Sequence, residues 1–147
     1  MDDVISVGGA RLFIGNSSPA SFQYQVYAGN ECGELKPFEC TYRGYGIVSA
    51  PPPSSGGVAI CEILNILEGY PLKELGFRSA KSAQYQIEAM RHAYVDRNSY
   101  LGDPDFVNNP LAHFLDKDYA AKIRAVIATD KAGVSRDIII RDCIHTT

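Results

Sequence analysis

Basic residues are not in excess in this chain of 147 residues, and long apolar runs are missing. Lys and Arg number 14 against 17 Asp and Glu, which gives a net charge of −3 at pH 7. Nucleic-acid-binding domains usually carry a basic stripe, so the balance predicts that nucleic acid is not a partner. No apolar run approaches the roughly 20 residues that a membrane-spanning helix requires, so no membrane span is expected.

Metal-binding spacing is absent as well. The four cysteines are Cys32, Cys40, Cys61 and Cys143, and no two of them form a C-x-x-C pair. A structural zinc site needs clustered thiolates or imidazoles, so no metal site is expected. Cys32 and Cys40 could close a short loop in an oxidising compartment, but free thiols are the favoured interpretation.

Residues 1–40 contain many turn-forming residues and show no helical period. They are unassigned, and we expect them to be divergent or poorly ordered, with one candidate strand in "FQYQVYA" at residues 22–28. The first residues are acidic and lack a long apolar stretch, so they do not resemble a secretory signal. Apolar residues make up 46% of the chain, which is enough for one domain with its own core.

The pattern becomes clearer from Thr41 onward. "TYRGYGIVSA" at residues 41–50 predicts one strand, and the "PPPSSGG" that follows predicts a rigid joint, because prolines fix φ and lack an N–H donor. Ser54 or Ser55 could cap the next helix, which we expect at residues 57–68 with Gly69 as its C-cap. That helix is apolar on almost every side, so it should be buried between two layers.

Two amphipathic helices are predicted further along. The first covers residues 80–100 with a serine cap, and its expected inward stripe is Ala83, Ile87, Met90 and Tyr94. The second covers about residues 116–127 with Asp116 as its cap; its expected inward residues are Tyr119, Ile123, Val126 and Ile127.

Glu88, His92 and Asp96 share one face of the first of these helices, at i, i+4 and i+8. Carboxylates and imidazole can ligate a metal, but eight residues span about 12 Å of helix axis, so the three cannot converge on one ion. Arg91 and Arg97 lie nearby, and a solvated, salt-bridged face is the favoured interpretation.

The remaining candidates are weaker. His113 is expected to pack or to lie at the surface, and Asp103 and Asp105 in "GDPDF" are expected to stabilise a turn. "SSGG" precedes a helix and could bind an anion, although it lacks the phosphate-binding pattern GxxxxGK[ST]. The residues therefore give no complete catalytic set.

Four segments in order closely resemble the gamma-glutamyltransferase (glutathione hydrolase) family, above all its bacterial members. They are "YRGYGIVSAPPPSSGG", "EILNILEGYPLKELGFRSA", "EAMRHAYVDRNSYLGDPDFV" and "DKDYAAKI", and the stretch that they mark, residues 41–137, covers about two thirds of the chain. The resemblance assigns residues 41–137 to the C-terminal end of the family's large subunit. Residues 138–147 are then a divergent tail, and "PPPSSGG" is an architectural joint between strand and helix.

The resemblance implies an α/β fold that is part of the αββα sandwich of the N-terminal-nucleophile hydrolases, here helix-rich with a few strands. Family members are precursors that cut themselves into a large and a small subunit, so a complementary small subunit is the expected partner. The family reaction transfers or hydrolyses the γ-glutamyl group of glutathione-like compounds through a threonine nucleophile. It uses no metal and no organic cofactor.

The family nucleophile is the first threonine of a pair that is followed by histidine. Thr146 begins such a pair, but no histidine follows it, and the approach from "SRD" is several residues short. The favoured interpretation therefore assigns no catalytic, cofactor-binding or metal-binding residue to this chain. It leaves the substrate-binding residues unknown and expects the chain to be inactive by itself, so whether it is an enzyme stays open.

Two alternatives remain at this point: a non-catalytic docking domain or relic, and a related N-terminal-nucleophile acylase. Family members are typically periplasmic or extracellular, but the sequence shows no signal peptide, so localisation is not assigned.

Overall fold

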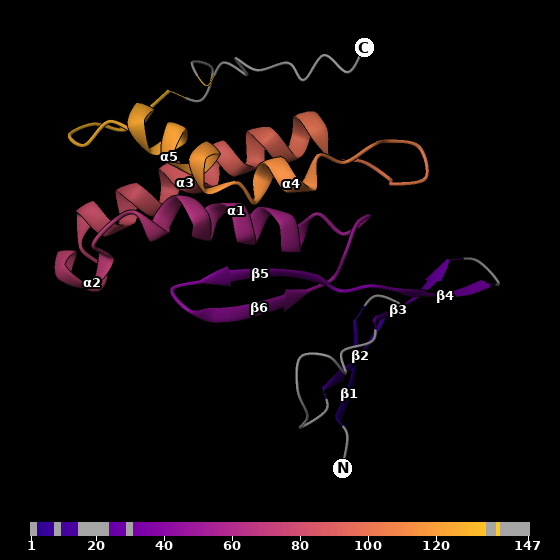
Figure 1. Ribbon diagram of the computed structural model, residues 1–147. Helices are drawn as coiled ribbons and strands as arrows, with labels where there is room; N and C mark the ends of the chain where they lie inside the picture. Colours follow the sequence, from indigo (N-terminus) through magenta and orange to yellow (C-terminus); the bar gives the residue numbers. More distant parts are fainter. Residues whose placement is uncertain (1–2, 8–9, 15–23, 29–30, 135–137, 139–147) are drawn as a thin grey trace.

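The computed structural model describes residues 3–7, 10–14, 24–28, 31–134 and 138, with side chains from residue 35 onward. Figure 1 shows a hairpin covered by a layer of helices, with a second small sheet beside it. The elements in chain order are β1 (Asp3–Val7), β2 (Ala10–Ile14), β3 (Tyr24–Ala28), β4 (Glu31–Leu35), β5 (Phe38–Tyr42), β6 (Tyr45–Ser49), α1 (Gly56–Glu68), α2 (Leu72–Leu75), α3 (Ala80–Tyr100), α4 (Leu111–Phe114) and α5 (Lys117–Val126).

The first four strands form an antiparallel sheet in the order β1-β2-β3-β4. Strand β3 confirms the candidate strand in "FQYQVYA", shortened to residues 24–28. The other three strands lie in a range where the sequence indicated no regular element. Their short lengths and the turn-forming residues between them gave no strong period to read.

Strands β5 and β6 form a tight hairpin, so the single strand expected over residues 41–50 is wrong. Tyr42 pairs with Tyr45, which leaves Arg43 and Gly44 as a two-residue turn. Both have positive φ, +50° and +84°. Two consecutive left-handed residues make the turn whose twist matches an antiparallel pair, and glycine adopts that conformation without steric cost. The hairpin begins at Phe38, inside the range that the sequence left unassigned.

The proline joint lies between the hairpin and α1. Ser54 donates a backbone hydrogen bond to the carbonyl of Pro51 (3.1 Å), which closes a turn, and Ser55 is the N-cap of α1. The cap position is confirmed, but the hydroxyl of Ser55 makes no capping bond with the helix. It accepts instead from Nε of Arg97 on α3, at 2.7 Å. Gly69 follows the helix as its C-cap, as predicted.

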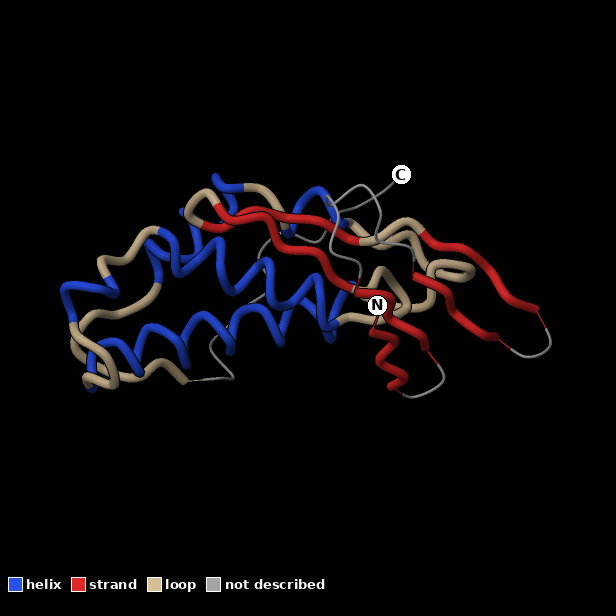
Figure 2. Tube along the Cα trace, turned by 90° about the horizontal axis from the view of Figure 1, so that it is seen from below, coloured by secondary structure: helices blue, strands red, loops and turns tan. Residues whose placement is uncertain are grey.

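Helix α1 is sandwiched, which confirms the expectation from its apolar surface. The hairpin covers one side, while α3, α4 and α5 contact the other (Figures 1 and 2). Two apolar clusters result: one between α1, α3 and α5, which includes Ile66, Tyr85 and Ile123, and one between the hairpin, α1 and α4, which includes Phe38 and Phe114.

A disulfide joins the hairpin to α1 inside the second cluster. Cys40 on β5 is bonded to Cys61 on α1, so the expectation of free thiols is wrong for these two residues. The pairing of Cys32 with Cys40 is wrong for the same reason. The sequence offered no sign of this bond, because strand and helix meet only after the joint has reversed the chain.

The stripe expected to face inward on α3 faces outward instead. Ile87, Met90 and Tyr94 are 56%, 43% and 48% exposed, and Ala83 is exposed as well. The buried face carries small and polar residues, namely Ser82, Tyr85, Glu88, Ala89, Ala93 and Asp96. Ala89 and Ala93 let α1 and α3 approach closely, and the polar groups find partners across the interface, so the larger apolar residues lie outside.

The last turn and helix largely follow the sequence. Asp116 caps α5 by accepting from the backbone N–H of Asp118 at 2.9 Å. Ile123 and Ile127 are buried as predicted, while Val126 is 71% exposed, so its inward assignment is wrong. Within the described ranges, α3 is the longest helix, and neither it nor any other is apolar enough to cross a membrane.

Candidate functional site

The structure places the three acid and imidazole side chains of α3 in a buried setting, not on a solvated face. Glu88 is 4% exposed and Asp96 is 6% exposed, so the solvated face favoured from the sequence is wrong, while the expected salt bridge with Arg91 is confirmed at Glu88. Asp96 accepts from Tyr119 of α5, whereas Glu88 accepts from the backbone N–H of Gly133, so the two acids have separate partners. They therefore do not act as one constellation.

Asp96 lies in a buried acid cluster with Glu62 of α1 and Tyr119 of α5. The hydroxyl of Tyr119 donates to Oδ2 of Asp96 at 2.5 Å. Glu62 is 2% exposed, and among the described residues its Oε1 has no hydrogen-bond partner. Burial, followed by the hydrogen bond and the charge of Asp96, raises the pKa of Glu62 to about 9. Glu62 is therefore a neutral carboxylic acid at pH 7.

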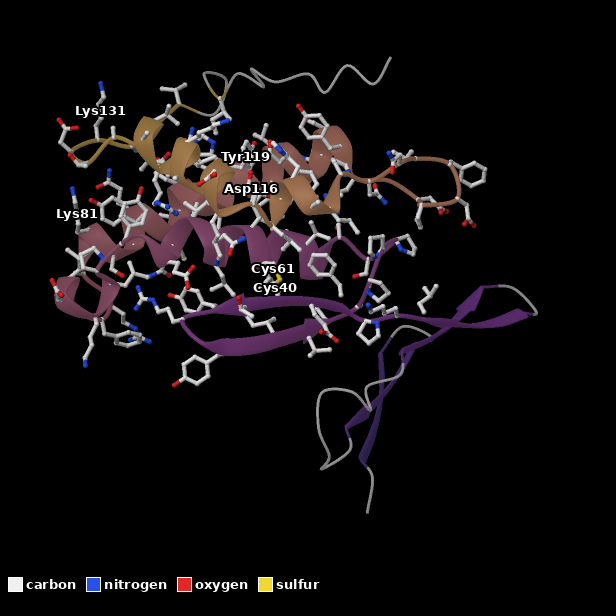
Figure 3. The ribbon with its side chains drawn as sticks, in the orientation of Figure 1. Cys40, Cys61, Lys81, Asp116, Tyr119 and Lys131 are labelled. Carbon is white, nitrogen blue, oxygen red and sulfur yellow. A yellow bond between two sulfur atoms is a disulfide. The ribbon has the colours of Figure 1, made fainter. Side chains whose placement is uncertain are left out.

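The same cluster affects the phenol. Burial and then the bond to Asp96 raise the pKa of Tyr119 above its ordinary value, so the phenol stays a hydrogen-bond donor. The three side chains come from three helices, α1, α3 and α5, and they connect these helices in the interior. Figure 3 shows Tyr119 on α5, within the helical layer.

Glu88 belongs to a different contact. Its carboxylate pairs with Arg91 at 2.6 Å and accepts from the backbone N–H of Gly133 at 2.8 Å. His92 lies between the two acids on the helix, and burial lowers its pKa, so it is neutral at pH 7. No group of three His, Cys, Asp or Glu side chains in the described part of the chain could hold a metal ion.

A cavity of about 280 Å³ opens beside the proline joint. Its walls are the joint on one side and the end of α3 on the other; the lining residues are Pro52, Pro53, Ser54, Ser55, Arg97, Asn98, Leu101, Gly102 and Asp103. Arg97 donates to Ser55 Oγ and to Asn98 Oδ1, at 2.7 and 2.9 Å. Because its guanidinium is engaged with the joint, the geometry favours an architectural role for "PPPSSGG", and anion binding at "SSGG" stays a prediction.

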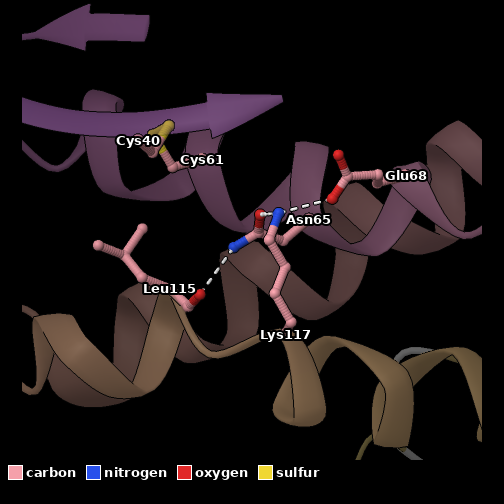
Figure 4. The surroundings of a disulfide bond; sticks show 6 residues. All are labelled: Cys40, Cys61, Asn65, Glu68, Leu115 and Lys117. Atoms are coloured by element: carbon pink, nitrogen blue, oxygen red, sulfur yellow. Dashed lines mark hydrogen bonds and ion pairs between the residues drawn. A yellow bond between two sulfur atoms is a disulfide. The ribbon is translucent and has the colours of Figure 1, made fainter. Parts of the chain in front are cut away.

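A second polar contact fixes the middle of α1, and sequence reasoning missed it. Asn65 donates through Nδ2 to the carbonyl of Leu115 at 3.2 Å, and Lys117 donates to Asn65 Oδ1 and Glu68 Oε2 at 2.5 and 2.6 Å (Figure 4). The ammonium of Lys117, with the backbone N–H of Arg43, lowers the pKa of Glu68. A lone asparagine in an otherwise apolar helix was the available signal, because a buried amide needs partners.

His113 and the two aspartates of "GDPDF" have the structural roles that the sequence predicted. The ring of His113 packs 3.9 Å from the ring of Tyr119, and Asp103 Oδ1 accepts from the backbone N–H of Asp105 at 3.0 Å. Packing and a stabilised turn are thus confirmed for "NPLAHF" and "GDPDF". Thr146 lies outside the described residues.

The buried acids are therefore unsuited to catalysis. General acid–base chemistry needs a side chain within hydrogen-bond reach of a substrate, and Glu62 and Asp96 lie inside the helical layer. The described residues assemble a scaffold of hairpin, joint and helices.

Known proteins share the sequence and the fold of this scaffold. Residues 25–143 match the protein family described as Gamma-glutamyltranspeptidase. A glutathione hydrolase proenzyme of Pseudomonas sp. (strain A14) is 77% identical over 105 residues, which are 71% of this chain and 18% of that protein. An Acylase ACY 1 proenzyme of Pseudomonas sp. (strain V22) is 46% identical over 97 residues, 66% of this chain and 17% of that protein.

Among solved structures, the gamma-glutamyltranspeptidase of Helicobacter pylori is similar with a TM-score of 0.71 and 42% identity. The match covers 74% of this chain and 31% of that one. The chain thus spans about a fifth of the length of the curated relatives that it matches.

Proposed function

Because the chain belongs to the gamma-glutamyltranspeptidase family, we propose that it is part of an enzyme that transfers or hydrolyses the γ-glutamyl group of glutathione-like compounds. The observation that carries the proposal is the 77% identity to a protein named as a glutathione hydrolase proenzyme. Its fold, a helix-rich α/β piece of the family's N-terminal-nucleophile hydrolase sandwich, agrees with that assignment.

The role of this chain in the enzyme is to support the reaction and not to carry it out. Its buried side chains, such as Glu62, Asp96 and Asn65, hold helices together, and its prolines fix the connection between hairpin and α1. A scaffold of this kind positions a site built from other residues, because catalytic groups must be held within a fraction of an ångström by the elements behind them.

The nucleophile that we propose is an N-terminal threonine of a complementary small subunit. Its hydroxyl oxygen bonds to the γ-glutamyl carbonyl carbon, its own α-amine takes the hydroxyl proton, and the leaving amine receives that proton as its bond to carbon breaks. Water then splits the resulting ester in hydrolysis, and an amino acid or peptide amine attacks it in transpeptidation. No step requires an oxidant or a reductant.

The partner surface in this proposal is the exposed apolar face of α3. Ile87, Met90 and Tyr94 line a shallow groove together with Ile138. Exposed apolar surface of this kind is typical of contacts with another chain or domain. In this proposal the complementary part of the enzyme packs against this face of α3.

A release assay tests the proposed inactivity of the chain alone. The purified 147-residue chain should release no p-nitroaniline from γ-glutamyl-p-nitroanilide above the rate without protein, because catalysis needs a nucleophile, a base and oxyanion donors together. Saturable release that disappears in Thr146→Ala would show that the chain is itself the enzyme. It would also make Thr146 the nucleophile.

An exchange experiment tests the scaffold role directly. The segment of the Pseudomonas sp. (strain A14) proenzyme that matches 105 residues of this chain is replaced by those residues of this chain. We expect the chimera to cleave itself and to release p-nitroaniline at a rate within about tenfold of the parent, because buried contacts are kept at high identity. A chimera that folds but neither processes nor reacts would contradict the proposal.

One observation favours a second candidate, an acylase of the same family, namely the 46% identity to an Acylase ACY 1 proenzyme. The segment of this chain should then also support self-cleavage and activity when it replaces the matching segment of the Acylase ACY 1 proenzyme. Activity in both chimeras would indicate a common scaffold whose substrate choice is set elsewhere. Activity only in the acylase would favour the second candidate.

A further inference from the structure

The disulfide between Cys40 and Cys61 lies between the hairpin and α1 (Figures 3 and 4). Cys40 is the central residue of β5, and its neighbours on the same strand face are Phe38 and Tyr42. The Cα atoms of the two cysteines are 6.1 Å apart, within the range of about 4.4–6.8 Å that suits a disulfide. Strand and helix thus meet at a distance that this bond can span.

The surroundings of the two sulfurs are apolar. Cys61 is 1% exposed and packs in a cluster with Phe38, Val58 and Phe114, while Cys40 is half-buried against the same cluster. The chain between the two cysteines holds the hairpin turn, β6, the proline joint and the first turn of α1. The disulfide therefore closes a ring around the whole connection between hairpin and helix.

We propose that this disulfide is a permanent staple, made while the hairpin docks on α1 and then shielded by that docking from thiol reagents. Two thiols give up two protons and two electrons to a small disulfide oxidant such as oxidised glutathione, which leaves as two thiols. The chain then requires a compartment that forms disulfides during its folding. The staple does not depend on the proposed function, but that function gives it a purpose.

The purpose follows from the substrate class. An enzyme that acts on glutathione works in the presence of a thiol, and a labile disulfide would be exchanged. Attack by a thiolate on Cys40 Sγ must expel Cys61 as a thiolate into an apolar cluster, where the charged sulfur is not hydrated, so its departure is slow. A thiol can therefore reduce the bond only after the hairpin has separated from α1.

The test uses the full chain carrying Cys32→Ser and Cys143→Ser, so that only the two cysteines of interest remain. Protein folded with a glutathione redox buffer should show no reactive thiol in denaturant with Ellman's reagent, and two after reduction. Dithiothreitol should reduce the native protein at least about tenfold more slowly than the urea-unfolded protein. Two reactive thiols before reduction, or equal rates in both states, would overturn the proposal.

A melting experiment provides the matched control. Cys61→Val keeps the buried side chain apolar and removes the bond, so its melting temperature should fall by roughly 10 °C. Prolonged reduction should lower the melting temperature of the parent to a similar value and leave that of Cys61→Val unchanged. If the parent shows two reactive thiols after reduction but keeps its melting temperature, the bond is not a staple. Both measurements are independent of γ-glutamyl chemistry, so their failure and the failure of the proposed function are separate results.

Discussion

At the scale of single residues, Glu62 is the side chain whose chemistry departs furthest from its ordinary behaviour. A carboxyl group buried without a cation is held neutral, because the charged form loses its hydration. Glu62 meets Asp96, another acid, and one of its oxygens finds no partner among the described residues. It therefore binds a proton in the folded chain at a pH where it would be ionised in the unfolded chain.

The first prediction concerns the pH dependence of stability. Because the folded pKa of Glu62 is about 9 and its ordinary value is 4.5, the folded state holds one more proton between these limits. The contribution of this proton to stability is fully present below pH 4.5. As the pH rises toward 9, the free energy of unfolding falls by up to about 1.4 kcal/mol per pH unit. Urea unfolding of the parent at pH 6 and pH 8 measures this slope.

The matched variant is Glu62→Gln, which imitates the neutral acid in shape and keeps a donor for Asp96. It should raise the free energy of unfolding at pH 7 by roughly 2–3 kcal/mol and remove most of the slope. Glu39 is exposed on β5, so Glu39→Gln serves as a control that should leave the slope unchanged. A slope of the same size in Glu62→Gln would assign the effect to another group.

At the scale of elements, the contact between the hairpin and the first turn of α1 depends on the absence of a side chain. A Cβ at Gly57 would lie 2.7 Å from Ser49 Oγ and 3.0 Å from the carbonyl oxygen of Ala50. A Cβ at the neighbouring Gly56 would meet only Ser54 Oγ, at 3.9 Å. The two glycines of "SSGG" thus have different roles, although they are adjacent in one helix.

The second prediction uses this pair. Gly57→Ala should lower the free energy of unfolding by about 1–3 kcal/mol, because it pushes α1 away from the end of β6. Gly56→Ala should be neutral or raise the free energy by up to about 1 kcal/mol, because alanine is the better helix former. Thermal melts of both variants measure the difference. Equal effects of the two substitutions would show that close approach at Gly57 is not a constraint.

At the scale of the whole molecule, the described chain leaves apolar side chains in water. Ile87, Met90 and Tyr94 form one stripe along α3, and Ile138 lies against the same groove. The hairpin β5–β6 pairs with no further strand among the described residues, so its outer edges are open to pairing. Both features fit a piece that is completed by other parts of an enzyme.

The third prediction is that the isolated chain binds an apolar dye and self-associates through this stripe. Ile87→Lys with Met90→Gln should lower dye fluorescence and shift sedimentation toward the monomer, while the melting temperature changes little, because exposed positions carry little packing energy. Phe77→Gln is the control, since Phe77 is 90% exposed but lies outside the stripe. A monodisperse parent without dye binding would contradict the prediction and favour a self-sufficient domain.

The sequence alone determined the three longer helices and their ends, but not the short helices α2 and α4. Helix α3 occupies residues 80–100 as predicted, and α1 and α5 agree within a residue, because capping side chains, glycines and prolines act on their immediate neighbours. The family also followed from the order and spacing of four local segments, and residues 25–143 match it. The turn at Asp103 and the joint after Pro51 likewise depend on contacts between residues that are close in sequence.

Only the tertiary structure decided which face of each helix is buried and which cysteines pair. On α3 the large apolar residues Ile87 and Met90 were predicted to face inward. Instead α1 packs against Ala89 and Ala93, because two helices can approach closely only where small residues lie at the contact. Cys40 reached Cys61 because the proline joint reverses the chain, and Glu62 and Asp96 became neighbours because α3 packs back along α1. Contacts between residues distant in sequence depend on the relative placement of whole elements, and local propensity carries no information about that placement.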